Sequence, residues 1–305
     1  MDVFLAQPRG FCAGVRRAIS LVEKTLSENG APIYIRHEIV HNKHIIEDLK
    51  QRGVIFIDDL DEITDKTRPV IFSAHGVAKA VRLEAKAEGL HVLDAICPLV
   101  ETVHRKILQL EEKKAEIIII GKATHPEIIG TVGQLDKQTD VHIINSLAEA
   151  EKLAIAPDKA VGIITQTTLS VDETKDIIKY LQHRFTNIIN KTQPNICFAT
   201  TNRQKAMRKL VEKTQNILII GSKNSSNSLH LREAALKFGA KQAWLIDDAG
   251  EADWSALDKC DSVGISAGAS APEYLVEELL AFFKKRYDNI NFHDVIVIKE
   301  NISFK

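Results

Sequence analysis

A threefold repeat of cysteines and polar residues runs through most of the chain. Cys12, Cys97 and Cys197 each precede an amphipathic stretch, then an apolar run, then a polar loop. At 29, 28 and 28 residues after the respective cysteines, these loops contain His41, His125 and Ser225. Such regular spacing predicts three related structural units around one centre.

Each cysteine also precedes apolar residues at helical spacing. Val15, Ala18 and Val22 follow Cys12 in this way. Pro98 directly follows Cys97 and suits the first position of a helix, where its missing N–H is not needed. We therefore expect the cysteines near helix N-termini, where free N–H groups and the helix dipole favour thiolates.

Short apolar runs between the helical stretches predict buried parallel strands. The first run of each repeat, rich in isoleucine, covers residues 32–35, 117–120 and 217–220. A second strand and loop follow at 70–76, 162–168 and 263–270, with helices expected at 78–86 and 171–184 and a last strand at 295–298. This alternation predicts an α/β fold in which ligands bind at the carboxyl ends of the strands.

The expected organisation is three pseudo-symmetric α/β lobes with short parallel sheets. Their expected ranges are 1–96 with the N-terminal strand and Cys12, 97–194, and 195–282, followed by a C-terminal extension at 283–305. A net charge of −1 gives no general attraction to nucleic acid or membranes. Four sparse cysteines without a CxxC pair, no secretory signal and no long apolar run lead us to expect a reducing, cytoplasmic location.

Three cysteines in register favour a metal or iron–sulfur site over three isolated buried thiols. Cys260 lies out of register in a charged stretch, and we expect no ligand role for it. A structural zinc site normally takes four ligands, whereas a cluster held by three cysteines keeps one iron open. The lack of a CxxC pair disfavours structural zinc, but the long spacings do not decide between these sites.

Polar residues at the ends of the predicted strands suggest a cradle for phosphate or diphosphate. They include His41, His75, His125, Ser225, Ser226, Asn227 and Ser270. Glu127 can relay protons, although a carboxylate in the first turn of a helix is equally ordinary. Thr167 and Thr168 can orient a hydroxyl, and the serines can equally cap a helix.

These residues lie in motifs that resemble the 4-hydroxy-3-methylbut-2-enyl diphosphate reductase family of the methylerythritol phosphate route to isoprenoids. The motifs cover nearly the whole chain in the family's order: PRGFCAGVRRAI (8–19), RHEIVHN (36–42), FSAHGV (72–77), CPLV (97–100), HPE (125–127), TQTTLSVDET (165–174), CFATTNRQ (197–204), GSKNSSNS (221–228) and SAGASAP (266–272). Ile96, Glu101 and Phe198 depart from the usual family residues.

The resemblance implies three lobes around a central 4Fe-4S cluster, with Cys12, Cys97 and Cys197 as its ligands. It implies that the substrate diphosphate is held by His41, His75, His125, Ser225, Ser226, Asn227 and Ser270. It assigns proton relay to Glu127 and places Thr167 near the substrate hydroxyl. The implied reaction is a two-electron reductive dehydroxylation to isopentenyl and dimethylallyl diphosphates. An external donor of the ferredoxin or flavodoxin type supplies the electrons.

Two other functions stay open at this point. His125 and Glu127 are also possible zinc ligands, which would suit a zinc-dependent phosphate-ester hydrolase or lyase. A cluster-based redox-sensing binding protein is the second alternative, against which the near-neutral charge counts. Metal analysis separates the zinc enzyme from the reductase, and reductive turnover separates the reductase from the sensor.

Overall fold

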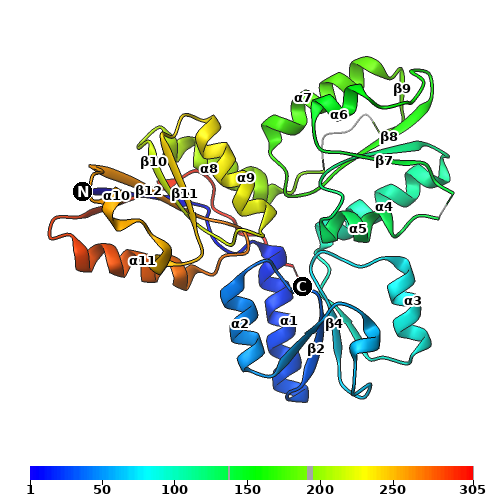
Figure 1. The fold of residues 1–305 in the computed structure, drawn as a ribbon, viewed down its shortest axis with the longest axis horizontal. Helices are drawn as coiled ribbons and strands as arrows, with labels where there is room; N and C mark the ends of the chain where they lie inside the picture. Colours follow the sequence, from blue (N-terminus) through cyan, green and yellow to red (C-terminus); the bar gives the residue numbers. More distant parts are fainter. Residues whose placement is uncertain (137, 191–194, 305) are drawn as a thin grey trace. The chain divides into compact units, whose positions relative to one another are not determined.

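The computed structural model describes residues 1–136, 138–190 and 195–304. The chain forms two compact units. One contains Met1–Arg16, His41–Glu47 and Phe198–Lys305, and the other contains Arg17–Val40 and Asp48–Cys197. In the described residues, the strands form three parallel sheets flanked by helices (Figure 1), which confirms the predicted α/β class.

The second of these units contains two four-stranded sheets. The first has the order β3-β2-β4-β5 and is built from β2 (Ile33–Arg36), β3 (Val54–Ile57), β4 (Val70–Phe72) and β5 (Val92–Asp94). The helices in this part of the chain are α1 (Ala13–Asn29), α2 (Lys43–Gln51) and α3 (Lys79–Ala87). α1 and α2 each contribute residues to both units.

The other sheet of this unit repeats the same order, β7-β6-β8-β9. Its strands are β6 (Glu116–Ile120), β7 (Val141–Ile144), β8 (Ala160–Thr165) and β9 (Asn187–Ile188). Its helices are α4 (Pro98–Glu112), α5 (Pro126–Val132), α6 (Leu147–Glu151) and α7 (Val171–Arg184). Alternate residues of β6 face opposite layers, so that Ile118 packs with Leu181 of α7 while Ile119 packs with Ile107 of α4.

The unit that includes both chain ends has one five-stranded sheet, in the order β11-β10-β12-β1-β13. Its strands are β1 (Asp2–Gln7), β10 (Asn216–Ile220), β11 (Gln242–Ile246), β12 (Ser262–Ala267) and β13 (Asn291–Ile296). Its helices are α8 (Phe198–Val211), α9 (Ser226–Lys237), α10 (Trp254–Leu257) and α11 (Glu273–Arg286).

The N-terminal strand was expected in a first lobe of residues 1–96, but it lies in the five-stranded sheet. β1 pairs with β12 and β13, at the position that β5 and β9 occupy in the other two sheets. The expected extension at 283–305 likewise contains the end of α11 and β13, and the strand expected at 295–298 starts at Asn291 because it pairs with β1 along its length. The expected boundary at 194/195 borders residues 191–194, which lie outside the described residues.

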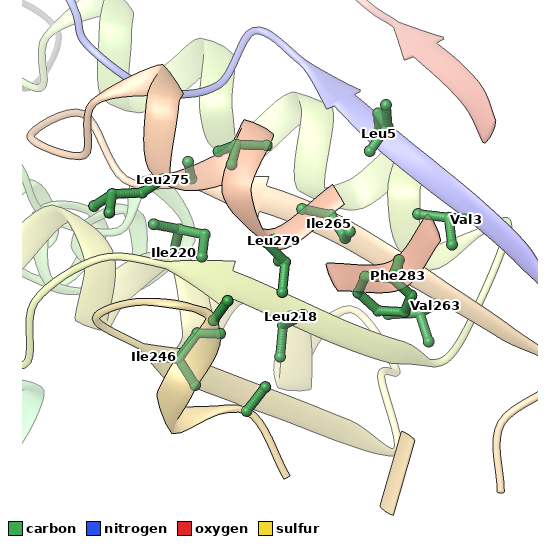
Figure 2. Packing of buried hydrophobic residues seen from close by; sticks show 14 of the residues in the cluster. Val3, Leu5, Leu218, Ile220, Ile246, Val263, Ile265, Leu275, Leu279 and Phe283 are labelled. Carbon is green, nitrogen blue, oxygen red and sulfur yellow. The ribbon is translucent and has the colours of Figure 1, made fainter. Parts of the chain in front are cut away.

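The core of this five-stranded sheet lies on both of its faces. Figure 2 shows Val3, Leu218 and Ile265 packed against Leu279 and Phe283 of α11. The opposite face packs against α8 and α9, which lie on the other side of the strands in Figure 1. Each fully buried side chain of this kind contributes about 1.5–3 kcal/mol. The sheet therefore holds its strand ends, and the loops that leave them, on a rigid base.

No helix in the described part of the chain has both the length and the apolar character that crossing a bilayer requires.

Candidate functional site

The three repeated cysteines occupy equivalent positions in the three sheets. Each follows the fourth strand of a sheet, which is β5, β9 or β1, and each comes directly before a helix. The backbone N–H of each cysteine donates to the carbonyl two residues beyond the third strand of that sheet. These bonds of 3.0–3.1 Å join Cys12 to Ala269, Cys97 to Ala74 and Cys197 to Thr167. The repeat seen in the sequence is therefore also a repeat of structure.

The surroundings of these thiols suit metal ligands. In the described part of the chain none of the three forms a disulfide, and all three are partly exposed. The N–H of Val15, in the first turn of α1, points to the Cys12 sulfur at 3.5 Å. Cys97 is the N-cap of α4, with Pro98 at the first helical position as expected. Helix N-termini favour the anionic thiolate that binds metals.

Cys260 has different surroundings. Its sulfur donates to the carbonyl of Ala256 at 3.5 Å. Burial raises the pKa of its thiol, and the neighbouring Asp261 raises that pKa further. A neutral thiol is a poor metal ligand, so the structure gives this cysteine no ligand character.

Glu127 is a buried carboxylate in the first turn of α5, with only 2 % of its surface exposed. Its Oε1 accepts a hydrogen bond from the Thr167 backbone N–H, and its Oε2 accepts one from the Thr167 hydroxyl, both at 2.7 Å. Burial raises the pKa of Glu127 to about 7, and the two hydrogen bonds only partly offset this effect. The carboxyl can therefore both hold and release a proton near neutral pH.

This pKa predicts a pH-dependent stability difference between the wild type and a Glu127→Gln variant. The unfolded carboxyl ionises near its ordinary pKa of 4.5, whereas the folded one stays protonated up to about 7. Stability of the wild type relative to the variant should therefore be greatest below about pH 4.5, fall by roughly 3 kcal/mol as pH rises to about 7, and change little above that. Denaturant unfolding of both proteins at several pH values measures this. A difference that does not change with pH would show that Glu127 titrates normally.

Two predicted histidines lie together in the same unit. The rings of His75 and His125 are 5.7 Å apart and meet edge to face. His125 caps α5, and its Nδ1 accepts the N–H of Glu127 at 3.1 Å. In the neutral ring the proton therefore lies on Nε2, which is a hydrogen-bond donor. Thr168, in the loop after β8, accepts a hydrogen bond from Gln166 at 2.9 Å.

The polar residues of the other unit form a second connected group. The hydroxyls of Ser225, which caps α9, and Ser270 are 3.1 Å apart. Ser270 also donates to the backbone carbonyl of His41 at 2.9 Å. Asn227 accepts from the Ala269 N–H at 2.8 Å, and Ser226 is the first residue of α9. This group gathers hydroxyls and an amide at the start of a helix, where an anion is favoured.

The two groups repeat each other in position. His125 and Ser225 both come five residues after the second strand in the order of their sheet, which is β6 or β10, and both cap the next helix. The residue two places later accepts an N–H from the loop after the third strand, as Glu127 does from Thr167 and Asn227 from Ala269. Predicted site residues within each unit are thus brought together by the same local architecture.

Some buried polar residues of the site lie outside the predicted set. Gln166 donates to Thr168 and accepts from the Lys122 N–H at 3.1 Å, which joins two loops of one sheet. Thr200 on α8 accepts from the Asn227 amide at 3.2 Å. Gln166 lies in the motif at 165–174 and Thr200 in the motif at 197–204, so membership of these motifs was the sequence signal that could have identified both.

Comparison with known proteins supports one family. The family model described as LytB protein matches residues 3–284. A 4-hydroxy-3-methylbut-2-enyl diphosphate reductase of Ruegeria pomeroyi is 45 % identical over 305 residues, covering 100 % of this chain and 96 % of its own. The reductase of the same name from Shewanella oneidensis is 48 % identical over 286 residues, covering 93 % and 89 %.

Solved structures agree with this match. The E-1-hydroxy-2-methyl-but-2-enyl-4-diphosphate reductase of Plasmodium falciparum has a TM-score of 0.91 and 32 % identity, covering 100 % of this chain and 95 % of its own. An (E)-4-hydroxy-3-methyl-but-2-enyl diphosphate reductase, the terminal enzyme of the non-mevalonate pathway, has a TM-score of 0.67 and 31 % identity, covering 93 % and 99 %. Since the family model matches most of the chain and the relatives match it over nearly their full length, the chain belongs to the LytB family.

Proposed function

We propose that the chain is a reductase that converts 4-hydroxy-3-methylbut-2-enyl diphosphate into isopentenyl and dimethylallyl diphosphates. The observation that carries this function is the 45 % identity to a reductase of that name over all 305 residues. The substrate loses its hydroxyl as water and takes up two electrons and two protons. One C–O bond breaks and one C–H bond forms, and the carbon that receives the proton decides between the two products.

Cys12, Cys97 and Cys197 are assigned as the ligands of one 4Fe-4S cluster. Their equivalent places after the fourth strands and before helices support this assignment, as does the partial exposure of all three thiols. A cluster with three protein ligands supplies one-electron transfer and an open Lewis-acid position. The protein's own residues then have to bind the diphosphate, orient the alcohol and provide protons.

The diphosphate is assigned to the polar residues at the strand ends. Nε2 of His125 is a donor in the neutral ring, and His75 lies beside it. The start of α9 brings together hydroxyls, the Asn227 amide and the N-terminal N–H groups of the helix. The full set is His41, His75, His125, Thr168, Ser225, Ser226, Asn227 and Ser270. Binding the unreactive diphosphate tightly positions the alcohol for reaction.

Glu127 and Thr167 are assigned as the proton relay. The Thr167 hydroxyl lies 2.7 Å from a Glu127 oxygen. A proton can therefore pass through this hydroxyl between the carboxyl and a substrate hydroxyl that is hydrogen-bonded to Thr167. A carboxyl whose pKa is raised to about 7 by burial is protonated in about half of the molecules at neutral pH and can supply a proton to the departing oxygen. Uptake of a new proton then prepares it to protonate the allyl carbon.

The remaining assignments are coarser. Three α/β lobes, each built on one sheet, are proposed near the ranges 1–96, 97–194 and 195–282, with β1 and β13 counted in the third lobe. A cytoplasmic location and an external electron donor of the ferredoxin or flavodoxin type are proposed from the family resemblance.

The zinc-dependent alternative gains no support from the local geometry. It relies on His125 and Glu127 as ligands. Both Glu127 oxygens instead accept hydrogen bonds from Thr167, and Nδ1 of His125 accepts the Glu127 N–H. A solely redox-sensing role has no observation in its favour, so the reductase is the one function proposed.

Anaerobic purification tests the proposed function. The protein should be brown, contain about four irons per chain, and reduce the diphosphate alcohol with a low-potential donor. Electron paramagnetic resonance of the reduced protein should change when the diphosphate alcohol is added. Colourless, iron-free protein that lacks reductive turnover after careful anaerobic handling would reject the proposal.

A further inference from the structure

Arg203 is a charged side chain buried completely in the unit that contains the five-stranded sheet. It lies on α8, and its Nε and Nη2 both donate to the Gly10 carbonyl, at 3.1 and 2.6 Å. Its Nη1 donates to the Ala199 carbonyl at 2.9 Å. Burying a guanidinium is costly unless its donors are paired, and here two of them converge on a single carbonyl.

That carbonyl belongs to the loop that leads from β1 to Cys12. Gly10 has a φ of +67°, a conformation that favours glycine, and a Cβ at this position would lie 3.3 Å from the Ala271 carbonyl oxygen. The Gly10 N–H donates to the Ala267 carbonyl at 3.2 Å, and the Cys12 N–H donates to that of Ala269 at 3.1 Å. The loop is thus fixed to β12 on one side and to Arg203 on the other.

The C-terminal tail supplies the counter-charge for Arg203. Both Glu300 carboxylate oxygens lie 3.3 Å from its Nη1, and the Glu300 side chain is only 8 % exposed. The Asn202 amide donates to the same carboxylate at 3.0 Å. The tail also forms one wall of a cavity of about 400 Å³ beside Phe11, the residue directly before Cys12. A buried ion pair therefore links the end of the chain to this loop.

We propose that Arg203 is a positioning residue for Cys12, and that Glu300 of the C-terminal tail holds Arg203 in the geometry this requires. The guanidinium acts through the Gly10 carbonyl, two residues before the cysteine, and it needs no contact with substrate. This inference rests on the proposed role of Cys12 as a cluster ligand. If Arg203 and Glu300 have these roles, the motif at 197–204 and the C-terminal tail both help to position Cys12.

Thiol alkylation in the metal-free protein tests this positioning. In Arg203→Lys, the rate at which iodoacetamide modifies Cys12, followed by peptide mass spectrometry, is expected to rise about tenfold because the loop opens more often. The rate at Cys97 should not change. Lysine keeps the positive charge, so a faster reaction reports loop opening and not a larger thiolate fraction. Glu300→Gln keeps arginine at position 203 but removes its counter-charge, so Arg203 is held less firmly and the Cys12 rate should rise about threefold.

A matched control is Arg184→Lys. Arg184 also donates to several backbone carbonyls, including that of Ala150 at 3.0 Å, but it lies at the end of α7 in the other unit. The Arg184→Lys variant should leave the Cys12 alkylation rate unchanged.

After cluster reconstitution, Arg203→Lys should also lose iron to a chelator faster than wild type. Wild-type rates at Cys12 in both test variants would overturn the proposal, and so would equal rises at Cys12 and Cys97. Failure of the proposed function shows separately, as wild-type protein that binds no iron.

Discussion

Replacing Glu127 with glutamine is expected to lower reductive turnover by about 10²–10⁴-fold while the iron content stays at the wild-type level. Glutamine has nearly the same volume and keeps a carbonyl oxygen for Thr167, but it has no proton to give at neutral pH. Glu127 is the buried carboxyl whose pKa is raised to about 7, so its loss removes the assigned proton source. Steady-state turnover with a chemically reduced donor, together with iron analysis, measures both quantities.

Glu101→Gln is a suitable control for this variant. Glu101 is also a carboxylate in the first turn of a helix, α4, but its side chain is exposed. The control should retain wild-type turnover. Equal turnover in Glu127→Gln and wild type would place the proton donor elsewhere. A loss of iron in Glu127→Gln would mean that the substitution disturbs the cluster site and not proton transfer.

The Cys97→Ser substitution is expected to abolish stable cluster binding. A serine hydroxyl does not ionise near neutral pH and is a much harder ligand than a thiolate. The iron content of the variant should therefore fall well below the roughly four irons per chain expected for the wild type. Turnover should fall with it. Cys12→Ser and Cys197→Ser should behave in the same way, because the three cysteines occupy equivalent positions in the sheets. Iron and sulfide analysis after anaerobic reconstitution provides the measurement.

Cys260→Ser is the internal control for that series. The pKa of the Cys260 thiol is raised mainly by burial, and the residue lies outside the repeated pattern. This variant should keep its iron and its turnover. Four irons per chain in Cys97→Ser, or loss of iron in Cys260→Ser, would contradict the ligand assignment.

The sequence predicts some strands and misses others, and strand length alone does not separate the two groups: the three-residue β4 lies within an expected strand and loop, whereas the five-residue β11 was not expected. The isoleucine-rich runs of β6 and β10 show their burial directly, and they appear within one residue of the expected positions. β5 and β9 have only three and two residues, too few for a recognisable pattern. The partners of β1 lie about 260 and 290 residues further along the chain, so no local pattern assigns it to its sheet.

For the candidate site, the sequence likewise shows local features but not those that depend on tertiary structure. Spacing and resemblance pick out its residue types and positions, because loops at strand ends repeat along the sequence. The burial of Glu127 is a tertiary property. A glutamate in the first turn of a helix is ordinarily solvated, and only the loop after β8 places Thr167 against it. Arg203 was missed for the same reason, since arginine on a helix is normally exposed.

The place of β1 between β12 and β13 affects how the protein matures on the ribosome. β1 is made before both of its neighbours, which follow it by about 260 and 290 residues along the chain. At about 5–20 residues per second, roughly 15–60 seconds separate the two events. The Cys12 loop, which donates hydrogen bonds to Ala267 at the end of β12 and to Ala269 after it, therefore forms only after β12 has been made. Until β12 has been made, the Cys12 loop lacks the backbone carbonyls that fix it, so a cofactor held by Cys12 has to be inserted after that point.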